Sequence, residues 1–167
     1  FQGDDSTRRE MPAQIGIAMT PILHTSERGR ALSIGLGTGV TARATHAAGF
    51  KALDVIELSG DIVRMAKTYF EQVNAKVLDQ PNVKTHVTDG RNFLLLTEAE
   101  YDLISMEISS IWFAGAASLY NMEMYELVRK RLKPTGVFQQ WIQLHRISKQ
   151  DLVVVLATMR SHFKNVW

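Results

Sequence analysis

The sequence predicts an α/β domain built on a doubly wound, mostly parallel sheet with helices on both faces. Five short apolar runs typical of buried strands alternate along the chain with segments of helical periodicity. Strands that alternate with helices pair in parallel, because each crossover helix returns the chain to the same edge of the sheet. A glycine-rich turn follows the first strand, as is common in such domains. With 167 residues, 46% of them hydrophobic, the chain is long enough for one core.

Residue patterns and helix-breaking residues place the expected elements. Strands are expected over residues 31–35, 52–58, 83–87, 102–107 and 137–144. Helices are expected over residues 40–48, 90–95, 123–132 and 149–163, and from Ser59 or Asp61, either of which can cap, to about Ala75. Pro134 and Gly136 end the helix that begins at residue 123, and Ser148 caps the last helix. Residues 10–24, a mixed segment with two prolines, can hold a helix that leads into the sheet.

The expected organisation is one domain with a short N-terminal addition. We expect the domain to occupy residues 29–167, with a sheet truncated at its C-terminal edge, and residues 4–28 to lead into it. Residues 1–3, Phe-Gln-Gly, match what a common tag-cleaving protease leaves behind, and are either a tag remnant or native sequence. An incomplete sheet edge is an open pairing surface, which favours association with a second copy.

The composition excludes several classes of function. Lys and Arg number 19 against 17 Asp and Glu, and the longest basic run is the triplet 129–131, so nothing favours nucleic-acid binding. The chain has no cysteine, and its five histidines show no metal-ligand spacing, so no metal is expected. No apolar run is long enough to cross a membrane and no signal peptide is visible. We therefore expect a cytoplasmic protein in which this segment makes no membrane contact.

The most informative motif joins the first strand to the next helix. Gly35, Gly37 and Gly39 stand at alternate positions after the apolar run 31–34, and Glu57 ends the second strand. Glycines let the backbone turn sharply and approach a ligand more closely than a residue with a Cβ can. A carboxylate at the end of the second strand can accept hydrogen bonds from ribose hydroxyls. Together these features predict a nucleoside cofactor, whereas the glycines alone are also compatible with a turn that only lets strand and helix pack.

The spacing of the glycines narrows the type of cofactor. A dinucleotide fingerprint needs Gly or Ala three positions after its second glycine, and Val40 occupies that position here. The motif is therefore GxGxG, which suits adenosine joined to an amino-acid-like tail without a diphosphate. S-adenosylmethionine or a relative fits this description.

Two more acidic residues are expected beside this turn. Asp89 follows the third strand and Glu107 ends the fourth. The carboxyl ends of parallel strands face one crevice, which is where open α/β sheets bind their ligands. Asp89 can accept a hydrogen bond from the exocyclic amine of adenine, or it can cap the short helix over residues 90–95, and one carboxylate can do both.

From Ser6 to Trp167 the chain resembles the spermidine synthase (polyamine aminopropyltransferase) family, and most of all its bacterial spermidine synthase-like members. The resemblance lies in Gln14, residues 34–42, Val55-Ile-Glu57, Asp89-Gly-Arg-Asn92, Glu107 followed by Trp112, Ala114-Gly115 with Ala117-Ser-Leu119, and Tyr125–Arg129 with Leu132-Lys-Pro134. The glycine segment is common to class I methyltransferases, so the resemblance implies a Rossmann-like, class I methyltransferase-like domain. It also implies a homodimer, and a chain that lacks the N-terminal β-hairpin domain of the authentic synthases.

The resemblance further implies transfer of an aminopropyl group from decarboxylated S-adenosylmethionine to a polyamine amine, with methylthioadenosine as product. It gives Glu107 the position of the catalytic base, the first Asp of the family's Asp-x-x-Asp-Pro motif, while Ser110 and Ile111 replace the second Asp and the Pro. A base is needed because an alkylammonium, with a solution pKa near ~10.4, must lose a proton before it attacks. The cofactor contacts implied are Gln14, Gly35, Gly37, Gly39, Glu57, Leu58, Asp89 and Gly90.

Three functions are compatible with the sequence. The favoured one is an aminopropyltransferase-like enzyme, with Glu57 on the ribose, Asp89 on the adenine and Glu107 as the base. The second is a methyltransferase that uses S-adenosylmethionine itself and therefore needs room for the methionine carboxylate. The third is a non-catalytic binding module descended from the family, which is consistent with the altered segment 107–111.

Overall fold

A computed structural model of the chain describes residues 11–108, 115–144 and 147–167. The strands are β1 (Arg30–Ile34), β2 (Ala52–Glu57), β3 (Val83–Val87), β4 (Tyr101–Met106) and β5 (Leu132–Gln140). The helices are α1 (Met11–His24), α2 (Val40–Ala47), α3 (Gly60–Tyr69), α4 (Glu71–Asn74), α5 (Gly90–Leu96), α6 (Met122–Arg131) and α7 (Lys149–His162), with short 3-10 turns η1 (Val77–Asp79) and η2 (Ala116–Leu119). The proposed tag remnant, residues 1–3, lies outside the described residues.

The five strands form one parallel sheet in the order β3-β2-β1-β4-β5. β1 lies at the centre, where Leu32 pairs with Asp54 of β2 on one side and with Ile104 of β4 on the other. The strand order reverses at β1, and in such sheets the crevice that holds a ligand opens at this switch point. The predicted doubly wound, parallel fold is confirmed.

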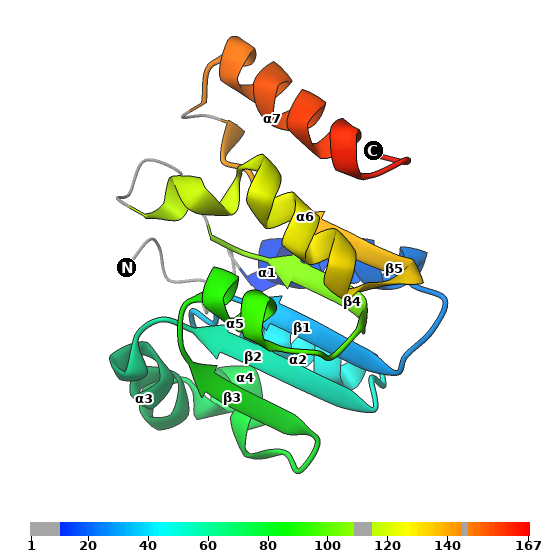
Figure 1. Cartoon of the computed structure of the whole chain (residues 1–167). Helices are drawn as coiled ribbons and strands as arrows, with labels where there is room; N and C mark the ends of the chain where they lie inside the picture. Colours follow the sequence, from blue (N-terminus) through cyan, green and yellow to red (C-terminus); the bar gives the residue numbers. More distant parts are fainter. Residues whose placement is uncertain (1–10, 109–114, 145–146) are drawn as a thin grey trace.

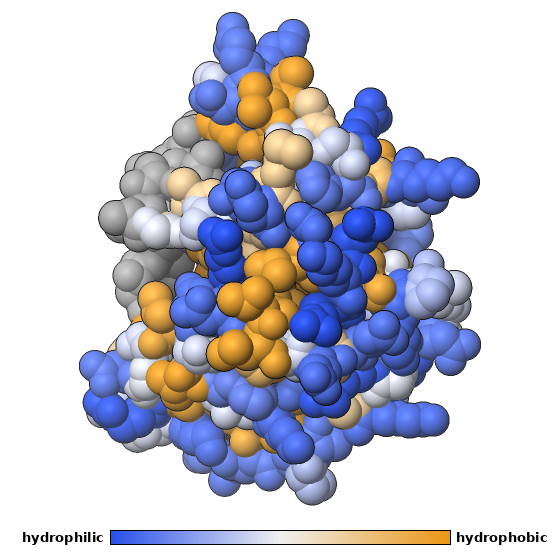
Figure 2. Space-filling view, in the orientation of Figure 1, coloured by the Kyte–Doolittle hydropathy of each residue, from blue (hydrophilic) through white to orange (hydrophobic). Residues whose placement is uncertain are grey.

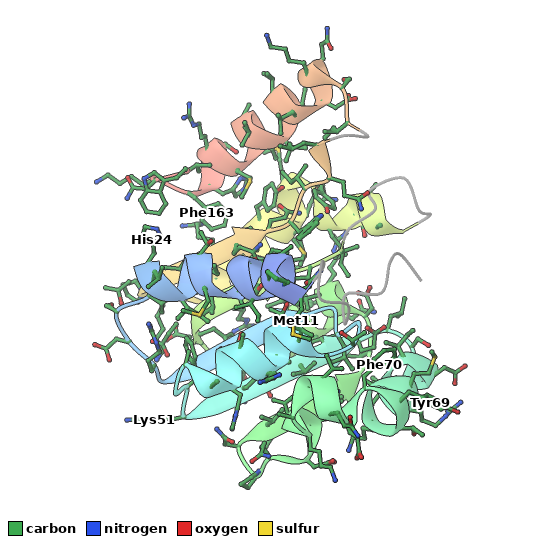
Figure 3. All side chains as sticks on the ribbon, turned by 180° about the vertical axis from the view of Figure 1, so that it is seen from behind. Met11, His24, Lys51, Tyr69, Phe70 and Phe163 are labelled. Atoms are coloured by element: carbon green, nitrogen blue, oxygen red, sulfur yellow. The ribbon has the colours of Figure 1, made fainter. Side chains whose placement is uncertain are left out.

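Helices cover both faces of the sheet, with α5 and α6 in front and α1 and α2 behind in the view of Figure 1. Seen from behind, α1 lies over the sheet beside α2, and its first and last residues, Met11 and His24, lie at opposite ends of that layer (Figure 3). Each face has its own apolar core. The core under α1, α2 and α3 includes Ala18, Ile22, Ala42, Phe50, Leu53, Val55 and Ala66. The core under α5, α6 and α7 includes Leu32, Ile34, Ile56, Leu94, Ile104, Met124, Val128 and Val155.

The helix expected to run from Ser59 or Asp61 to about Ala75 is broken in two. α3 ends at Tyr69 and α4 follows at Glu71, and the chain leaves α4 through Ala75 and Lys76, which both have φ of 53°. A left-handed residue ends a helix, so Ala75 takes the role that glycine more often has. The predicted single helix was therefore wrong in its length, because apolar periodicity does not reveal this kind of stop.

The fifth strand also differs from the sequence prediction. It begins at Leu132, directly after α6, and ends at Gln140 rather than at residue 144. Tyr101 of β4 pairs with Leu132 and Leu103 pairs with Val137, so β5 carries extra residues between these two pairs. Pro134 and Gly136 lie in this irregular part, and β5 borders only β4 in the described sheet, where a missing amide donor is tolerated. They follow the end of α6, whose C-cap is Leu132, one residue from the predicted helix end, and they also lie in a bulge of the strand.

Exposed apolar side chains gather on the face that α5 covers. Figure 2 shows an apolar group over α5 between hydrophilic residues. It contains Leu95 and Leu96 of this helix, which are 58% and 80% exposed. Among the described residues no helix is long and apolar enough to cross a membrane.

A buried carboxylate ties four strands together on the same face. Asp54 of β2 accepts hydrogen bonds from Arg30 Nε of β1 at 2.7 Å and from the Tyr101 hydroxyl of β4 at 3.2 Å, and it lies 2.9 Å from His86 Nε2 of β3. Burial by itself raises the pKa of Asp54, but the hydrogen bonds from Arg30 and His86 outweigh it and hold the pKa below its ordinary value. The ionised form is therefore part of the folded structure.

We predict that acid weakens the fold through this group. Because the pKa of Asp54 in the folded protein lies below its ordinary value of 3.8, the ionised carboxylate contributes fully above about pH 4, and its contribution is lost as the pH falls through the folded-state pKa. Asp54→Asn should lower the free energy of unfolding at pH 7 by about 2–4 kcal/mol. The variant should also lose less stability than the wild type between pH 7 and pH 3, as measured by urea unfolding.

The matched control is Asp61→Asn. Asp61 pairs with Arg64 on the surface, and its side chain is 74% exposed, so its loss should change the free energy of unfolding by less than about 1 kcal/mol. An Asp54→Asn variant with the same acid sensitivity as the wild type would contradict the role given to Asp54.

Candidate active site

The carboxyl edge of the sheet brings the sequence-predicted residues to one side of the molecule. The glycine turn follows β1, Glu57 is the last residue of β2, Asp89 comes two residues after β3, and Glu107 follows β4 directly. Since all strands are parallel, these ends lie along the same edge. The structure describes each of these residues, but it does not describe residues 109–114, so the expected contributions of Ser110, Ile111 and Trp112 lie outside it.

The glycine turn depends on backbone conformations that favour glycine. Gly35, Gly37 and Gly39 have φ of 99°, 55° and 90°. The Gly35 amide donates to the carbonyl of Ile56 on β2 at 2.8 Å, and the Gly39 amide closes the turn onto the Leu36 carbonyl at 2.9 Å. The turn therefore starts from the middle of the sheet and places its amides beside the end of β2.

Asn74 holds the same turn from the other side, and the sequence analysis missed it. Its side chain is buried, with only 1% exposed, and Nδ2 donates to the carbonyls of Thr38 at 3.0 Å and Ala66 at 2.9 Å. Its Oδ1 accepts from the Lys76 amide at 3.0 Å. One asparagine thus links the turn to α3 and to the end of α4. Nothing in the local sequence distinguishes it from a surface helical asparagine.

Glu57 connects the glycine turn to α3. Its Oε2 accepts from the Leu36 amide at 3.2 Å and its Oε1 accepts from the Ser59 amide at 3.0 Å. A carboxylate has about four acceptor positions, so two hydrogen bonds leave room for others. Ser59 occupies the N-cap position of α3, but its side chain makes no capping hydrogen bond. Ser59 thus stands at the N-cap position, as predicted, but its side chain does not cap α3, and its amide binds Glu57.

Three of the expected cofactor contacts, Asp89, Gly90 and Leu58, follow the ends of β2 and β3. Asp89 caps α5, with its Oδ1 accepting from the Asn92 amide at 2.9 Å, so the capping alternative is confirmed by geometry. Gly90 lies so close to β1 that a Cβ there would sit 2.6 Å from Ile34 Cγ2. Leu58, at the end of β2, is 72% exposed. An exposed leucine beside an acidic strand end offers apolar surface for a ligand.

Glu107 lies in a group of hydroxyl and amide side chains. Its Oε2 accepts from the Thr41 hydroxyl of α2 at 2.8 Å, and its Oε1 lies 3.2 Å from the Ser105 hydroxyl of β4. Gln14 of α1 reaches the same place, since its Oε1 lies 3.5 Å from Thr41 Oγ1. On the far side of Ser105 is Gln139 of β5, 2.5 Å away. The sequence analysis predicted Gln14 and Glu107 but missed Thr41, Ser105 and Gln139.

The arrangement divides into two parts. One part, formed by the glycine turn, Glu57, Leu58 and Asp89, presents acceptors and an apolar side chain. In the other part, the described hydrogen-bond partners of Glu107 are the neutral side chains of Thr41 and Ser105. Within the described part of the chain no group of three or more His, Asp or Glu side chains could hold a metal ion.

Comparisons with known proteins define the class of protein to which this site belongs. The family model for the spermine/spermidine synthase domain matches residues 10–167. The chain therefore belongs to the spermine/spermidine synthase family.

Individual relatives agree with this class. The polyamine aminopropyltransferase of Nitrosomonas europaea is 29% identical over 88% of this chain and 45% of its own length. The crystal structure of a spermidine synthase in complex with the transition-state analogue AdoDATO superposes with a TM-score of 0.83 at 19% identity, over 92% of this chain and 52% of that one. Human methyltransferase-like protein 13 in complex with SAH gives 0.68 at 19% identity, over 95% and 73%. The structural matches establish a shared fold, and the chain spans about half the length of the curated relatives it matches.

Two glycines allow a matched test of the turn. Gly39 and Gly49 have nearly the same φ, 90° and 88°, but a Cβ on Gly39 would lie 3.0 Å from Asn74 Cβ whereas one on Gly49 would meet nothing within 4 Å. Gly49→Ala should lower the free energy of unfolding by about 1–2 kcal/mol through backbone strain alone. Gly39→Ala should lower the free energy of unfolding by about 1–3 kcal/mol more than Gly49→Ala does, because Asn74 must move.

Urea unfolding of the two variants measures this difference. Equal losses would show that the turn adapts without disturbing Asn74, and would contradict the rigid contact described above.

Proposed function

We propose that this chain carries the adenosyl-binding and reacting part of a polyamine aminopropyltransferase. The enzyme would move an aminopropyl group from decarboxylated S-adenosylmethionine to an amine and release methylthioadenosine. The observation that supports this most directly is the placement of Glu57 and Glu107 at the ends of β2 and β4, on either side of the glycine turn that follows β1. In this proposal Glu57 binds the nucleoside and Glu107 binds the cationic amine.

The nucleoside part of the proposal rests on acceptors and shape. Glu57 keeps acceptor positions beyond its two amide hydrogen bonds, and these suit the two hydroxyls of a ribose. Asp89 has one hydrogen bond to the Asn92 amide and can accept another from an adenine amine. Leu58 supplies exposed apolar surface for a ring, while Gly35 and Gly37 let the backbone come close. Gln14 and Gly90 complete the contacts that we propose.

The reacting part of the proposal gives Glu107 two tasks. It attracts the cationic ammonium group and takes a proton from it, which leaves a neutral amine with a free electron pair. The amine nitrogen then bonds to the carbon that the sulfonium activates, while the bond from that carbon to sulfur breaks and its electron pair goes to sulfur. Thr41 and Ser105 hold the carboxylate in place, so that both its position and its orientation are set before an amine arrives.

The proposal also includes a cytoplasmic homodimer. The exposed leucines on α5 and the outer edges of β3 and β5 in the described sheet provide surfaces for self-association. Sedimentation or light scattering at several concentrations measures the oligomeric state, and cell fractionation measures the location.

Ligand binding separates the proposed activity from methyl transfer. Calorimetry should show binding of methylthioadenosine that is tighter than binding of S-adenosylhomocysteine. Glu57→Ala should weaken methylthioadenosine binding about 100-fold or more, because two hydrogen bonds to a charged group are lost. Glu126→Ala, which removes an exposed ion pair with Lys130 on α6, should leave binding unchanged. Preference for S-adenosylhomocysteine would instead favour a methyltransferase, and no binding of either compound would contradict the proposal.

Turnover tests the role of Glu107. With decarboxylated S-adenosylmethionine and a panel of diamines, we expect methylthioadenosine release by the wild type. The rate should fall at least about 100-fold in Glu107→Gln, because the amide cannot accept the proton. Binding of methylthioadenosine should survive this substitution. Wild-type protein that binds methylthioadenosine but turns over no amine would favour the non-catalytic module.

A further inference from the structure

Gln139 on β5 has no role in the proposed reaction, but it contacts Ser105, which in turn contacts the carboxylate of Glu107. Gln139 pairs in register with Ser105 on β4. The Ser105 hydroxyl is 2.5 Å from Gln139 Oε1 and 3.2 Å from Glu107 Oε1. A chain of three side chains therefore runs from β5 through β4 to Glu107.

The central hydroxyl faces two acceptors but carries one hydrogen. A serine hydroxyl can donate only one hydrogen bond, and both Gln139 Oε1 and the carboxylate of Glu107 accept. The shorter distance, 2.5 Å, is at the short end of the range for an O–H···O contact and below the range for an amide N–H···O contact. It is therefore consistent with the oxygen of Gln139, and not its nitrogen, facing Ser105.

The two hydroxyl donors are shielded from solvent. Ser105 is 2% exposed and Thr41, which donates to the other oxygen of Glu107, is 5% exposed. The described partners of Glu107 are Thr41 of α2 and Ser105 of β4, and these contact Gln14 of α1 and Gln139 of β5 in turn. All four side chains are uncharged. Glu57 is the titratable group at the end of β2, and two backbone amides bind it.

We propose that Ser105 is a positioning residue whose hydroxyl hydrogen is shared between Gln139 and Glu107, turning to Glu107 when that carboxylate is ionised and to Gln139 when it has taken up a proton. The proposal rests on the proposed function, in which Glu107 accepts the proton of an amine. Gln139 gives the hydroxyl a second partner, so that protonation of Glu107 leaves no buried hydrogen-bond donor without an acceptor.

Because Gln139 and Glu107 compete for the Ser105 hydrogen, removing the Ser105 hydroxyl and removing the Gln139 amide should shift the titration midpoint of Glu107 in opposite directions. Removing the hydroxyl takes away a donor to the ionised carboxylate, so Ser105→Ala should raise the titration midpoint of Glu107 by about one pH unit. Removing the competing acceptor leaves the hydroxyl to Glu107 alone, so Gln139→Met should lower the midpoint by about half a unit. In the double variant the Gln139 substitution should have no further effect, because there is no hydroxyl left to share.

Carbon-13 NMR of the side-chain carboxyls of the whole chain measures these midpoints directly, with the Glu107 signal assigned by its loss in Glu107→Gln. Thr41→Val serves as the comparison, since it removes the other hydroxyl donor and should raise the midpoint independently of Gln139. Ser105→Thr keeps a hydroxyl at the same position and should restore a midpoint close to the wild-type value. The unfolding transition of each variant checks that it folds.

Three results would overturn the proposal. They are an unchanged midpoint in Ser105→Ala, a raised midpoint in Gln139→Met, and additive effects in the double variant. The titration needs neither ligand nor turnover, so it fails or succeeds separately from the proposed aminopropyl transfer. If methylthioadenosine does not bind but the opposite shifts are found, the proposed function is wrong and the shared hydrogen stands as a property of the fold.

Discussion

The turn between β1 and α2 keeps its shape because its backbone groups have fixed partners on neighbouring elements. The Gly35 amide is bound by the Ile56 carbonyl, the Leu36 amide by Glu57 and the Thr38 carbonyl by Asn74. Three glycines with positive φ allow this path, but they do not by themselves select it, because glycine has the widest choice of conformations when unfolded. Selection comes from the partners. The rest of the carboxyl edge is built outward from this turn, since β2, α3 and α4 are held by the same contacts.

The parts of the fold that the sequence predicted are those governed by short-range patterns. Apolar strands, the glycine turn and the cap of the last helix are local features, and Ser148 does accept from the Asp151 amide as its sequence position suggested. The parts that it did not predict depend on distant residues. The break after Tyr69 and the left-handed Ala75 are stabilised in part by Asn74, whose own partners lie on the glycine turn and on α3. A short stretch of sequence around Asn74 does not reveal these partners, because they are brought to it by the fold.

The same reasoning explains which site residues were missed. Strand ends and topology are enough to place Glu57, Asp89 and Glu107 along one edge. The contacts around Glu107 depend instead on distant elements, since Thr41 of α2 is 66 residues from Glu107 and Gln139 of β5, which contacts Ser105, is 34 residues from Ser105. Such contacts are fixed by how α2 and β5 pack, and β5 itself contains a bulge that changes its register with β4. The one local signal was the unusual polar character of β5, which the sequence shows without indicating a partner.

The two acidic residues at the centre of the site are held by different kinds of donor, and the difference matches their proposed roles. Glu57 is bound by backbone amides, whose direction is fixed by the chain. Glu107 is bound by the hydroxyls of Thr41 and Ser105, which can rotate about the bond to oxygen. A group that only binds a nucleoside keeps one charge throughout, and fixed donors then stabilise it without reorganisation. A group that gains a proton changes its charge, and fixed amides would oppose that change because they favour the ionised form. Rotating hydroxyls with an alternative acceptor nearby oppose it less, because they can turn away when the carboxylate is protonated, so the donors at Glu107 suit its proposed role as a proton acceptor.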